Sequence, residues 1–431
     1  MKKNIAIIFG GKSTEHEISI LSAMQAMENM DREKYNLLPI YITKDGKWYY
    51  GEKLNKLSTY KNFNTKGLKE VAILPYDTNL YAKKLSGYKP MESIDCAFII
   101  MHGMNGEDGS LQGLMELANI PYSSCGILAS SIGMSKLAQK IFFTGLEIPV
   151  VPYFSITKNQ FEKMGEKVDI DKTLFPVIVK PNRLGSSIGI SFCKNKTTLK
   201  KALNLAFKFD DTVVVEKAIK RLKEVNISAL GDSEKILLSE TEQPQSNHEI
   251  LTFQDKYLGG SSKNGSASKG KILCGTKQIK FDIKYEKNSK NTLNFEKNTI
   301  KTEKIDVNNP EICINGNVNK QGTKQVGMQN LSRIIPANID IATKTLVEKY
   351  TKIIFQYLEC KGVIRIDFII DEKTKKLYVN EINTIPGSLA FYLWEYKGLD
   401  FKNELDKMVE IAIQTNNQKN NLQTTFEQKV L

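Results

Sequence analysis

Residues 362–387 read GVIRIDFIIDEKTKKLYVNEINTIPG, which predicts two strands joined by a polar turn. In the first strand, a period of two places the apolar side chains of residues 364, 366, 368 and 370 on one face. Arg365 and Asp367 lie on the opposite face, and in the second strand Glu381 and Asn383 share a face. We therefore expect a hairpin that buries one apolar face and gathers polar groups on the other.

Pairing of these two strands would bring Asp367, Glu381 and Asn383 together beside Arg365. Two carboxylates and one amide oxygen are hard ligands that suit Mg²⁺, with bound phosphates filling the remaining positions. The alternative is a solvated sheet face without a ligand. That alternative does not explain an asparagine directly before the turn at 384–387. We therefore predict a magnesium site on the hairpin.

Composition and charge describe an ordinary globular protein. The chain has 431 residues, with 61 Lys and Arg against 48 Asp and Glu, so its formal net charge is +13. Apolar residues make up 41% and charged residues 25%, which excludes wholesale disorder and a fibrous repeat. The length predicts about three domains.

No apolar run approaches the ~18 residues of a membrane-spanning helix, and the run at 5–9 is too short for a signal peptide. We expect a cytoplasmic protein with no membrane insertion. The lysines are spread along the chain among Asn, Glu and Asp, which favours a solvated surface over a nucleic-acid-binding stripe. The scattered cysteines favour reduced thiols in the core over a zinc site or disulfides. They are Cys96, Cys125, Cys193, Cys274, Cys313 and Cys360.

The first 133 residues alternate strands and helices. Apolar runs at 5–9 and 96–101 predict buried parallel strands, and helical spacing predicts helices at 17–30 and 111–118. This pattern predicts an N-terminal doubly wound α/β domain over residues 1–133.

A second domain is predicted at 134–222, with a helix at 135–144 and strands at 177–180 and 213–216. A third domain, 223–415, would contain the hairpin and a helix at 401–414.

Two segments of the third region and beyond are predicted to lie outside the packed core. The polar stretch at about 259–329 is too long for an ordinary loop and too polar for a core layer, so we expect a surface insertion. Residues 416–431 are expected to be a frayed, flexible tail.

The glycine-rich turn Gly10-Gly11-Lys12-Ser13 follows the first strand but lacks the spacing of a phosphate-binding P-loop, because Ala6 occupies the position of the first glycine. The turn leads into a helix, whose start offers free N–H groups and positive dipole character. Glu15 at this start either caps the helix or holds the ammonium group of a small zwitterion. The residues themselves leave both alternatives open.

Three further segments predict ligand contacts. His102 and three glycines follow the strand at 96–101, as a backbone-lined pocket requires, although a histidine there is as often a structural donor. Lys180 ends an apolar strand, and the Gly/Ser-rich loop at 182–189 is suited to closing over phosphates. Glu216 and Lys217 end another strand and provide an acceptor and a donor for an adenine base.

Together these segments closely resemble the D-alanine–D-alanine ligase family of ATP-grasp enzymes. They occur in the family's order and reach from near the first residue to about residue 390, apart from the insertion. The matching segments are 9–19, 102–113, 178–189, 215–217, 362–367 and 380–387. The resemblance implies an α/β, three-domain ATP-grasp architecture with ATP held between the second and third domains.

The resemblance also implies an activity and its cofactors. The expected enzyme is an ATP-dependent ligase that joins two D-alanines into D-alanyl-D-alanine through an acyl phosphate, for peptidoglycan precursor synthesis. It would use ATP and two Mg²⁺ or Mn²⁺ ions, with no nucleic-acid partner, and a homodimer is left open.

Residue by residue, the resemblance assigns roles to positions of this sequence. The magnesium ligands would be Asp367, Glu381 and Asn383. The ATP contacts would be Lys136, Lys180, Ser186, Glu216, Lys217, Glu224 and Lys256. Residues at the reaction centre would be Glu15, Ser187, Tyr257, Arg365 and Gly387, with His102, Ser388 and again Glu15 contacting substrate. A covering loop would include Phe253 and Asp255, and in this family a tyrosine at the position of Tyr257 goes with D-alanine as second substrate.

Two features depart from the family pattern. After Gly387 the family continues with small hydroxylated residues, whereas here the sequence is SLAFYLW at 388–394. The insertion falls where the covering loop should rejoin the core, near 333–337. One alternative is therefore the same carboxylate activation with another acceptor, such as D-lactate or another amino acid. A second alternative, a nucleotide-binding protein without turnover, is disfavoured because all three predicted metal ligands and Arg365 are present.

Overall fold

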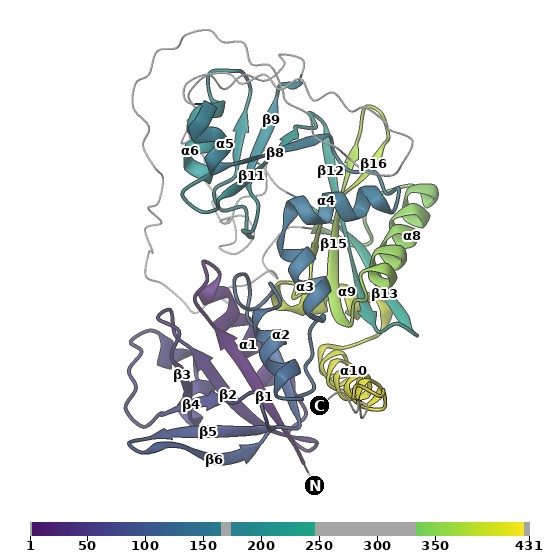
Figure 1. Cartoon of the computed structure of the whole chain (residues 1–431). Coiled ribbons are helices and arrows are strands. Elements are labelled where there is room, and N and C mark those ends of the chain that lie inside the picture. Colours follow the sequence, from purple (N-terminus) through teal and green to yellow (C-terminus); the bar gives the residue numbers. More distant parts are fainter. Residues whose placement is uncertain (1, 165–173, 246–332, 426–431) are drawn as a thin grey trace, which may run out of the picture. The chain divides into compact units, whose positions relative to one another are not determined.

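A computed structural model describes residues 2–164, 174–245 and 333–425 (Figure 1). The described residues form two compact units, one built from 2–149, 223–245 and 333–425 and the other from 150–164 and 174–222. The predicted insertion at about 259–329 and the covering loop with Phe253, Asp255, Lys256 and Tyr257 lie outside the described residues.

The first unit begins with a seven-stranded sheet of order β6-β5-β4-β3-β2-β1-β7. Strand β1 pairs in parallel with β2 and β7, and the other neighbours pair antiparallel. The strands are β1 Lys3–Gly10, β2 Tyr35–Ile42, β3 Trp48–Tyr50, β4 Lys69–Ile73, β5 Asn79–Lys84, β6 Gly87–Ser93 and β7 Cys96–Ile100. The predicted doubly wound parallel sheet is thus parallel only at β2-β1-β7, because short turns join the outer strands and require antiparallel pairing.

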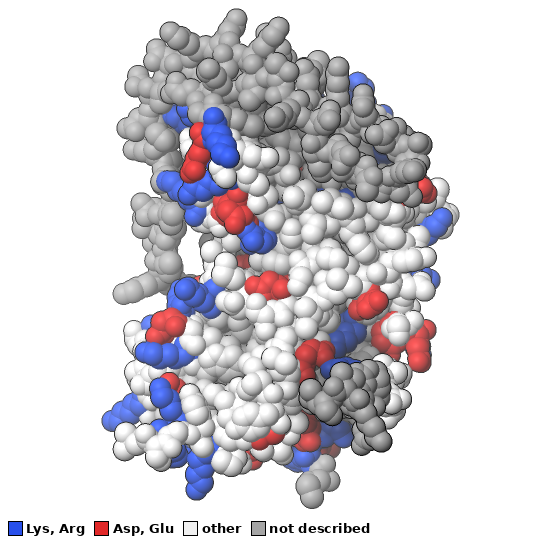
Figure 2. Space-filling model, in the orientation of Figure 1, with Lys and Arg blue, Asp and Glu red and all other residues white. Residues whose placement is uncertain are grey.

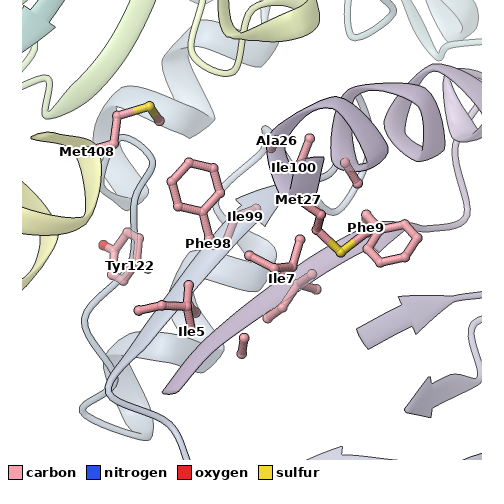
Figure 3. Packing of buried hydrophobic residues seen from close by; sticks show 14 of the residues in the cluster. Ile5, Ile7, Phe9, Ala26, Met27, Phe98, Ile99, Ile100, Tyr122 and Met408 are labelled. Atoms are coloured by element: carbon pink, nitrogen blue, oxygen red, sulfur yellow. The ribbon is translucent and has the colours of Figure 1, made fainter. Parts of the chain in front are cut away.

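The two helices predicted for the first region form, as α1 His16–Asn29 and α2 Ser110–Leu117, with short 3₁₀ turns η1 Glu52–Asn55 and η2 Leu57–Tyr60. They are followed by α3 Ile127–Met134, which was not predicted, and by α4 Lys136–Gly145, and both of these contact β16. Side chains of β1, β7 and α1 interdigitate with Tyr122 and Met408 (Figure 3). Met408 comes from the C-terminal helix, so the first and third regions of the sequence share one hydrophobic core.

A second sheet in the same unit has the order β14-β13-β12-β15-β16. Its strands are β12 Leu222–Gly231, β13 Ile236–Pro244, β14 Arg333–Ile334, β15 Gly362–Asp371 and β16 Leu377–Asn383. Helix α8 Ile341–Tyr357 packs against β13. The chain then continues through η5 Gly387–Ala390, α9 Phe391–Trp394, η6 Glu395–Lys397 and α10 Phe401–Asn420. Helix α10 extends past residue 416, where the frayed tail was predicted to begin, and contacts α1, β7 and β15.

The other unit is a four-stranded antiparallel sheet of order β10-β9-β11-β8. Its elements are β8 Tyr153–Thr157, α5 Lys158–Met164, β9 Val177–Pro181, β10 Ser191–Cys193, α6 Leu199–Ala206 and β11 Thr212–Lys217. Helix α6 packs on β9 and β10 over a small apolar core that includes Cys193. This unit starts at residue 150, whereas α4, predicted as the first helix of the second domain, belongs to the first unit.

The surface and the cysteines follow the sequence-based expectations as far as the described residues extend. On the face drawn in Figure 2, basic and acidic side chains are interspersed. Cys96, Cys125, Cys193 and Cys360 are buried free thiols. No helix among the described residues combines the length and apolar character needed to span a membrane.

Candidate functional site

The predicted hairpin forms, and its register brings the expected polar residues together. Strands β15 and β16 pair antiparallel, with Asp367 opposite Glu381 and Arg365 opposite Asn383. The Asn383 side-chain nitrogen donates to Asp367 Oδ2 at 3.2 Å. The register shifts directly after Asp367, which marks a β-bulge beside the polar cluster. The predicted convergence of these residues is therefore confirmed.

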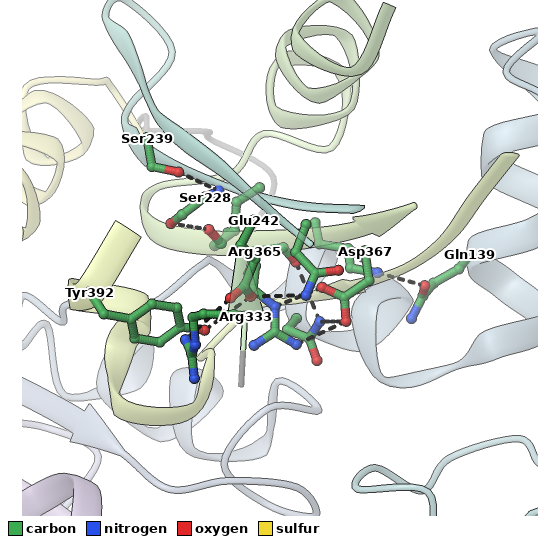
Figure 4. Close-up of polar contacts among 12 residues, drawn as sticks. Gln139, Ser228, Ser239, Glu242, Arg333, Arg365, Asp367 and Tyr392 are labelled. Carbon is green, nitrogen blue, oxygen red and sulfur yellow. Dashed lines mark hydrogen bonds and ion pairs between the residues drawn. The ribbon is translucent and has the colours of Figure 1, made fainter. Parts of the chain in front are cut away.

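Arg365 and Asp367 form a bidentate ion pair, with Nε donating to Oδ1 at 2.6 Å and Nη2 to Oδ2 at 2.8 Å (Figure 4). Arg365 and Asp367 are buried, whereas Glu381 and Asn383 on the same face are partly exposed. Burial lowers the pKa of Arg365, but the charges of Asp367 and Glu242 outweigh it and hold the pKa well above its ordinary value. The guanidinium is a permanent buried cation on the polar face of the hairpin.

Helix α4 supplies a lysine to the same cluster. Ser135 caps this helix, its Oγ accepting from Ala138 N at 3.2 Å. Lys136 is the first residue of α4, and its Nζ lies 3.4 Å from Glu381 Oε2. The predicted phosphate-contacting lysine is thus next to a predicted magnesium ligand. A lysine there offers a point charge to a phosphate that shares the cation.

The hairpin fits a hard cation by the chemistry of its donors. Asp367, Glu381 and Asn383 present carboxylate and amide oxygens from one strand pair, which is the donor type that Mg²⁺ binds. Among the described residues, no group of three or more His, Cys, Asp and Glu side chains gathers in a way that would hold a metal. A cation at the hairpin would therefore need the Asn383 amide and phosphate oxygens beside the two carboxylates.

Glu15 lies at the start of α1, behind the turn that follows β1. Gly10 and Gly11 both have φ +92°, and a Cβ on Gly10 would lie 2.2 Å from the Ile42 carbonyl oxygen, so only glycine fits this turn. Glu15 is buried at the N-cap position, yet its side chain makes no capping hydrogen bond. The Glu15 side chain therefore does not cap the helix in the structure.

The Glu15 carboxylate instead lies against the loop after β7. A Cβ on Gly103, which has φ +75°, would lie 2.9 Å from Glu15 Oε2. Burial and the charge of Glu15 raise the pKa of the neighbouring Glu107 well above its ordinary value. Glu107 is therefore mostly protonated at neutral pH, and Glu15 is the carboxyl group of the two that is suited to an ammonium group.

Glu107 is a residue to which the sequence reasoning gave no role. Its Oε2 accepts from Gly103 N at 2.7 Å and its Oε1 accepts from Ile385 N at 3.0 Å. The side chain therefore ties the loop after β7 to the turn after β16. The only signal in the sequence is its position inside the glycine-rich segment that follows His102.

His102 joins the same two segments. Its Nδ1 lies 3.0 Å from the Ile385 carbonyl oxygen, so Nδ1 carries the proton and Nε2 accepts from the Ser22 hydroxyl at 3.0 Å. Ser22 Oγ in turn accepts from Ser388 N at 3.3 Å. Burial lowers the pKa of His102 to about 4, so the ring is neutral at pH 7. His102 thereby places the predicted substrate residue Ser388.

The turn after β16 has an unusual backbone. Ser388, Leu389 and Ala390 have φ values of 51°, 54° and 57°, three successive non-glycine residues in the left-handed region. Such backbone is costly and persists where the surroundings fix it. All three residues are buried, and Gly387 stands at the start of this segment.

The four-stranded sheet of the other unit carries the predicted nucleotide residues on β9 and β11. Lys180 Nζ lies 2.8 Å from Glu216 Oε2, and both side chains are buried. Lys217 follows on the opposite face of β11 and is exposed. The structure thus brings Lys180 and Glu216 together and separates the side chain of Lys217 from them.

The predicted phosphate loop leaves β9 and contains two left-handed serines. Ser186 and Ser187 have φ values of 53° and 59°. The loop is anchored at its start, where Arg183 N donates to Asp210 Oδ2 at 2.6 Å and Arg183 Nη2 to Asp210 Oδ1 at 2.7 Å. Strained backbone of this kind is common where loops bind ligands. Glu224, the predicted ribose acceptor, is half-buried on β12 in the first unit.

Two antiparallel sheets, together with an N-terminal mixed sheet that is parallel at β2-β1-β7, match the ATP-grasp architecture that the resemblance implies. A family model described as D-ala D-ala ligase N-terminus matches residues 4–125, and one described as D-ala D-ala ligase C-terminus matches 142–274 and 285–410. The chain belongs to the D-alanine–D-alanine ligase family. The family predicted from the sequence is confirmed.

Individual relatives agree along most of the chain. A D-alanine–D-alanine ligase from Thermosipho melanesiensis is 34% identical over 415 residues, covering 95% of this chain and 94% of the relative. The crystal structure of VanG D-Ala:D-Ser ligase from Enterococcus faecalis matches with TM-score 0.66 and 25% identity, covering 96% of this chain and 100% of that one. A Bacillus anthracis D-alanine–D-alanine ligase complexed with ATP shares the fold with TM-score 0.57 and 20% identity, covering 97% of this chain and 99% of that one.

Proposed function

We propose that this chain is an ATP-dependent ligase that joins two D-alanines into D-alanyl-D-alanine for peptidoglycan precursor synthesis. Membership of the family supports the reaction. The observation that carries the proposal is the hairpin, on which Arg365, Asp367, Glu381 and Asn383 meet beside Lys136. These groups match what transfer of a phosphoryl group to a carboxylate needs.

The reaction has two covalent steps. A carboxylate oxygen of the first D-alanine attacks the γ-phosphorus of ATP, so a new O–P bond forms and ADP leaves. The amine of the second D-alanine then attacks the acyl carbon, an amide bond forms, and inorganic phosphate leaves with the oxygen it received. The ammonium of the second D-alanine loses one proton before the attack, and the nitrogen loses a second as the amide forms; both protons pass to solvent or to the departing phosphate.

The chain's residues would bind and orient these groups. Glu15 holds the ammonium of the first D-alanine, and Glu107 ties together the two loops beside it. Lys136 and Lys180 contact the phosphates of ATP. Arg365 stabilises the oxyanion of the tetrahedral intermediate, a contribution of about 3–4 kcal/mol for one well-placed donor.

Asp367, Glu381 and Asn383 would hold two Mg²⁺ or Mn²⁺ ions together with the phosphate oxygens. When bound, the ions neutralise charge on the phosphates during transfer. The bidentate pairing of Asp367 with Arg365 fixes the direction of that carboxylate.

The remaining predicted residues complete the nucleotide and substrate sites. Glu216, Lys217 and Glu224 would contact the adenosine part of ATP, and Ser186 and Ser187 would close over its phosphates. Lys256 and Tyr257 would belong to the covering loop, which excludes water from the acyl phosphate. His102, Gly387 and Ser388 would shape the substrate pocket. An ATP-consuming reaction of this kind fits a cytoplasmic enzyme.

A second candidate function is the same activation with another acceptor. It is favoured by the segment after Gly387, where bulky residues follow three left-handed ones. VanG, a D-Ala:D-Ser ligase, shares this fold. The acceptor subsite is thus the part of the proposal that needs the broadest test.

The test measures ATP-dependent phosphate release with D-alanine alone and with pairs of D-alanine and D-serine, D-lactate or L-alanine, with products identified by mass. We expect D-alanyl-D-alanine as the main product. Preferential formation of a mixed product would support the second candidate. Phosphate release that no amino acid stimulates would contradict both.

A further inference from the structure

Gln139 lies on the helix that supplies Lys136, and it reaches the strand that carries Glu381 and Asn383. It is buried on α4. Its Oε1 accepts from the Ile382 backbone N–H at 3.0 Å, and its Nε2 donates to the Gly133 carbonyl oxygen. Figure 4 shows the side chain extending from α4 to the strand, apart from the Arg365 cluster.

The bonded amide belongs to the residue between two predicted magnesium ligands. Strand β16 is the edge strand of its sheet, so amides on its outer side have no neighbouring strand to accept from them. The Gln139 amide oxygen takes the place of that strand at Ile382. Since Ile382 is flanked by Glu381 and Asn383, this one hydrogen bond fixes the position of the backbone that carries both side chains.

The strand needs such support at this point. The pairing of β15 with β16 runs from Asp367 opposite Glu381 directly to Phe368 opposite Val379, so Asn380 is an extra residue. A bulge interrupts the ladder and lets the bulged strand bend. The interruption falls next to Glu381, on the side away from Ile382. Gln139 therefore holds Ile382 two residues from the interruption and steadies Glu381 from the side that still pairs regularly with β15.

Gln139 also couples the strand to Lys136. The two residues are three apart on α4 and therefore share a face of the helix. Lys136 lies 3.4 Å from Glu381, while Gln139 holds the next residue of the strand. One turn of helix thus fixes both the backbone of the metal-binding strand and the charge beside it.

We propose that Gln139 is a positioning residue for the cation site, holding Glu381 and Asn383 in the geometry that binds the metal–nucleotide complex. The inference rests on the proposed function, because it assumes that these two residues ligate magnesium. Removing one group that orients a metal ligand typically weakens metal binding by about 10–100-fold.

The test compares Gln139→Met, which keeps the volume but removes the amide, with Gln139→Glu, which keeps an acceptor for Ile382 N–H. The matched control is Gln112→Met, which removes another buried glutamine amide that donates to the Gly106 carbonyl oxygen at 2.7 Å in the same unit. Three readouts are used on the full chain. They are hydrogen exchange at the Ile382 amide without metal, Mn²⁺ binding by electron paramagnetic resonance with a non-hydrolysable ATP analogue, and the Mg²⁺ dependence of turnover.

We expect Gln139→Met to speed exchange at Ile382 about 10-fold or more and to weaken Mn²⁺ binding by about 10-fold. Gln139→Glu should keep Ile382 protected. Gln112→Met should lower the thermal midpoint without changing either readout. If Gln139→Met binds Mn²⁺ as tightly as Gln112→Met does, while Asp367→Asn binds it more weakly, the inference is overturned and the metal site stands. Normal Mn²⁺ binding by Asp367→Asn would overturn the metal site and the inference together.

Discussion

Each unit contains one lysine–glutamate pair at a predicted ATP contact, and the two pairs differ in how they are enclosed. In the four-stranded sheet, Lys180 and Glu216 are 2.8 Å apart, and their side chains are 10% and 3% exposed. In the other unit, Lys136 and Glu381 are 3.4 Å apart, and Glu381 is 22% exposed. The first pair joins two strands of one sheet, whereas the second joins a helix to an edge strand.

The difference indicates separate roles for the two pairs. A short, buried pair within a sheet is rigid, and each charge depends on the other for compensation. We therefore expect Lys180 and Glu216 to act as a rigid contact for the nucleotide. The longer and more open pair at Glu381 lies opposite Asp367, where a carboxylate can exchange a lysine contact for a cation. We expect the first pair to matter most for stability and the second for turnover.

The largest expected effect is on turnover. Asp367→Asn and Glu381→Gln should each lower kcat by about 10³-fold or more, because the charge stabilisation lost is worth several kcal/mol. Glu381→Gln should keep the thermal midpoint within a few degrees, whereas Asp367→Asn also breaks the buried pair with Arg365 and should lower it, so both are assayed at a temperature where they are folded. The measurement is phosphate release across a range of Mg²⁺ concentrations. Near-normal rates at limiting Mg²⁺ would remove the metal assignment.

The next effect breaks the buried pair of the other unit. Glu216→Gln leaves Lys180 without its charged partner, and breaking one side of a buried pair costs about 3–5 kcal/mol. The thermal midpoint should therefore fall much further than in Lys136→Met, where the partner Glu381 is more exposed. Differential scanning calorimetry of the two variants makes the comparison. Equal losses of stability would contradict the distinction between the pairs.

Glu15 differs from both lysine–glutamate pairs, because its neighbour is another carboxyl group, that of Glu107. If it holds the first substrate's ammonium, Glu15→Gln removes a charged hydrogen bond worth about 1.5–3 kcal/mol. The KM for D-alanine should rise about 10–100-fold while the KM for ATP changes little. Steady-state kinetics with each substrate varied separate the two values. A rise confined to the KM for ATP would refute this role.

The smallest effect concerns a buried carboxyl outside the site. Glu404 on α10 is fully buried, and its carboxyl oxygens have no hydrogen-bond partner among the described residues. Burial and the charge of Glu395 raise its pKa well above the ordinary value. The folded protein accommodates the protonated Glu404 carboxyl better than the ionised one. The stability that this protonated carboxyl allows is present at low pH and is lost as the pH rises through the raised pKa.

Replacing Glu404 removes this dependence on pH. The thermal midpoint of Glu404→Gln, relative to that of the parent protein, should therefore rise by a few degrees from pH 5 to pH 8. A change of about 1 kcal/mol corresponds to roughly 2–4 °C for a domain of this size. Thermal unfolding at both pH values measures the difference. A gain that shrinks toward pH 8 would show that Glu404 is ionised and compensated in the folded protein.

The hairpin was predictable because its information is local. A period of two and a short turn predict the two strands and their polar residues. The regular ladder from the turn would place Asp367 opposite Asn380, and the bulge at Asn380, which the pattern does not reveal, brings Glu381 opposite Asp367. The family segments add the roles. The contacts of Lys136 and Gln139 with β16 were not predictable, because they depend on how α4 packs on an edge strand more than 200 residues later.

Other features escaped prediction for the same physical reason. Glu107 connects Gly103 to Ile385 only because the loops after β7 and β16 meet in the folded unit. Helix α10 continues to Asn420, beyond the predicted end at residue 414, although its last turns are polar in sequence. The sharing of one core by the first and third regions likewise depends on residues such as Met408 packing across the fold.

The most direct test of the account follows one oxygen atom through the reaction. D-alanine labelled with ¹⁸O in its carboxylate is turned over with unlabelled ATP, and the released phosphate is analysed by mass. Attack of the carboxylate on the γ-phosphorus predicts one ¹⁸O in each phosphate, together with labelled dipeptide. Dipeptide formed with unlabelled phosphate would contradict carboxylate activation by phosphoryl transfer.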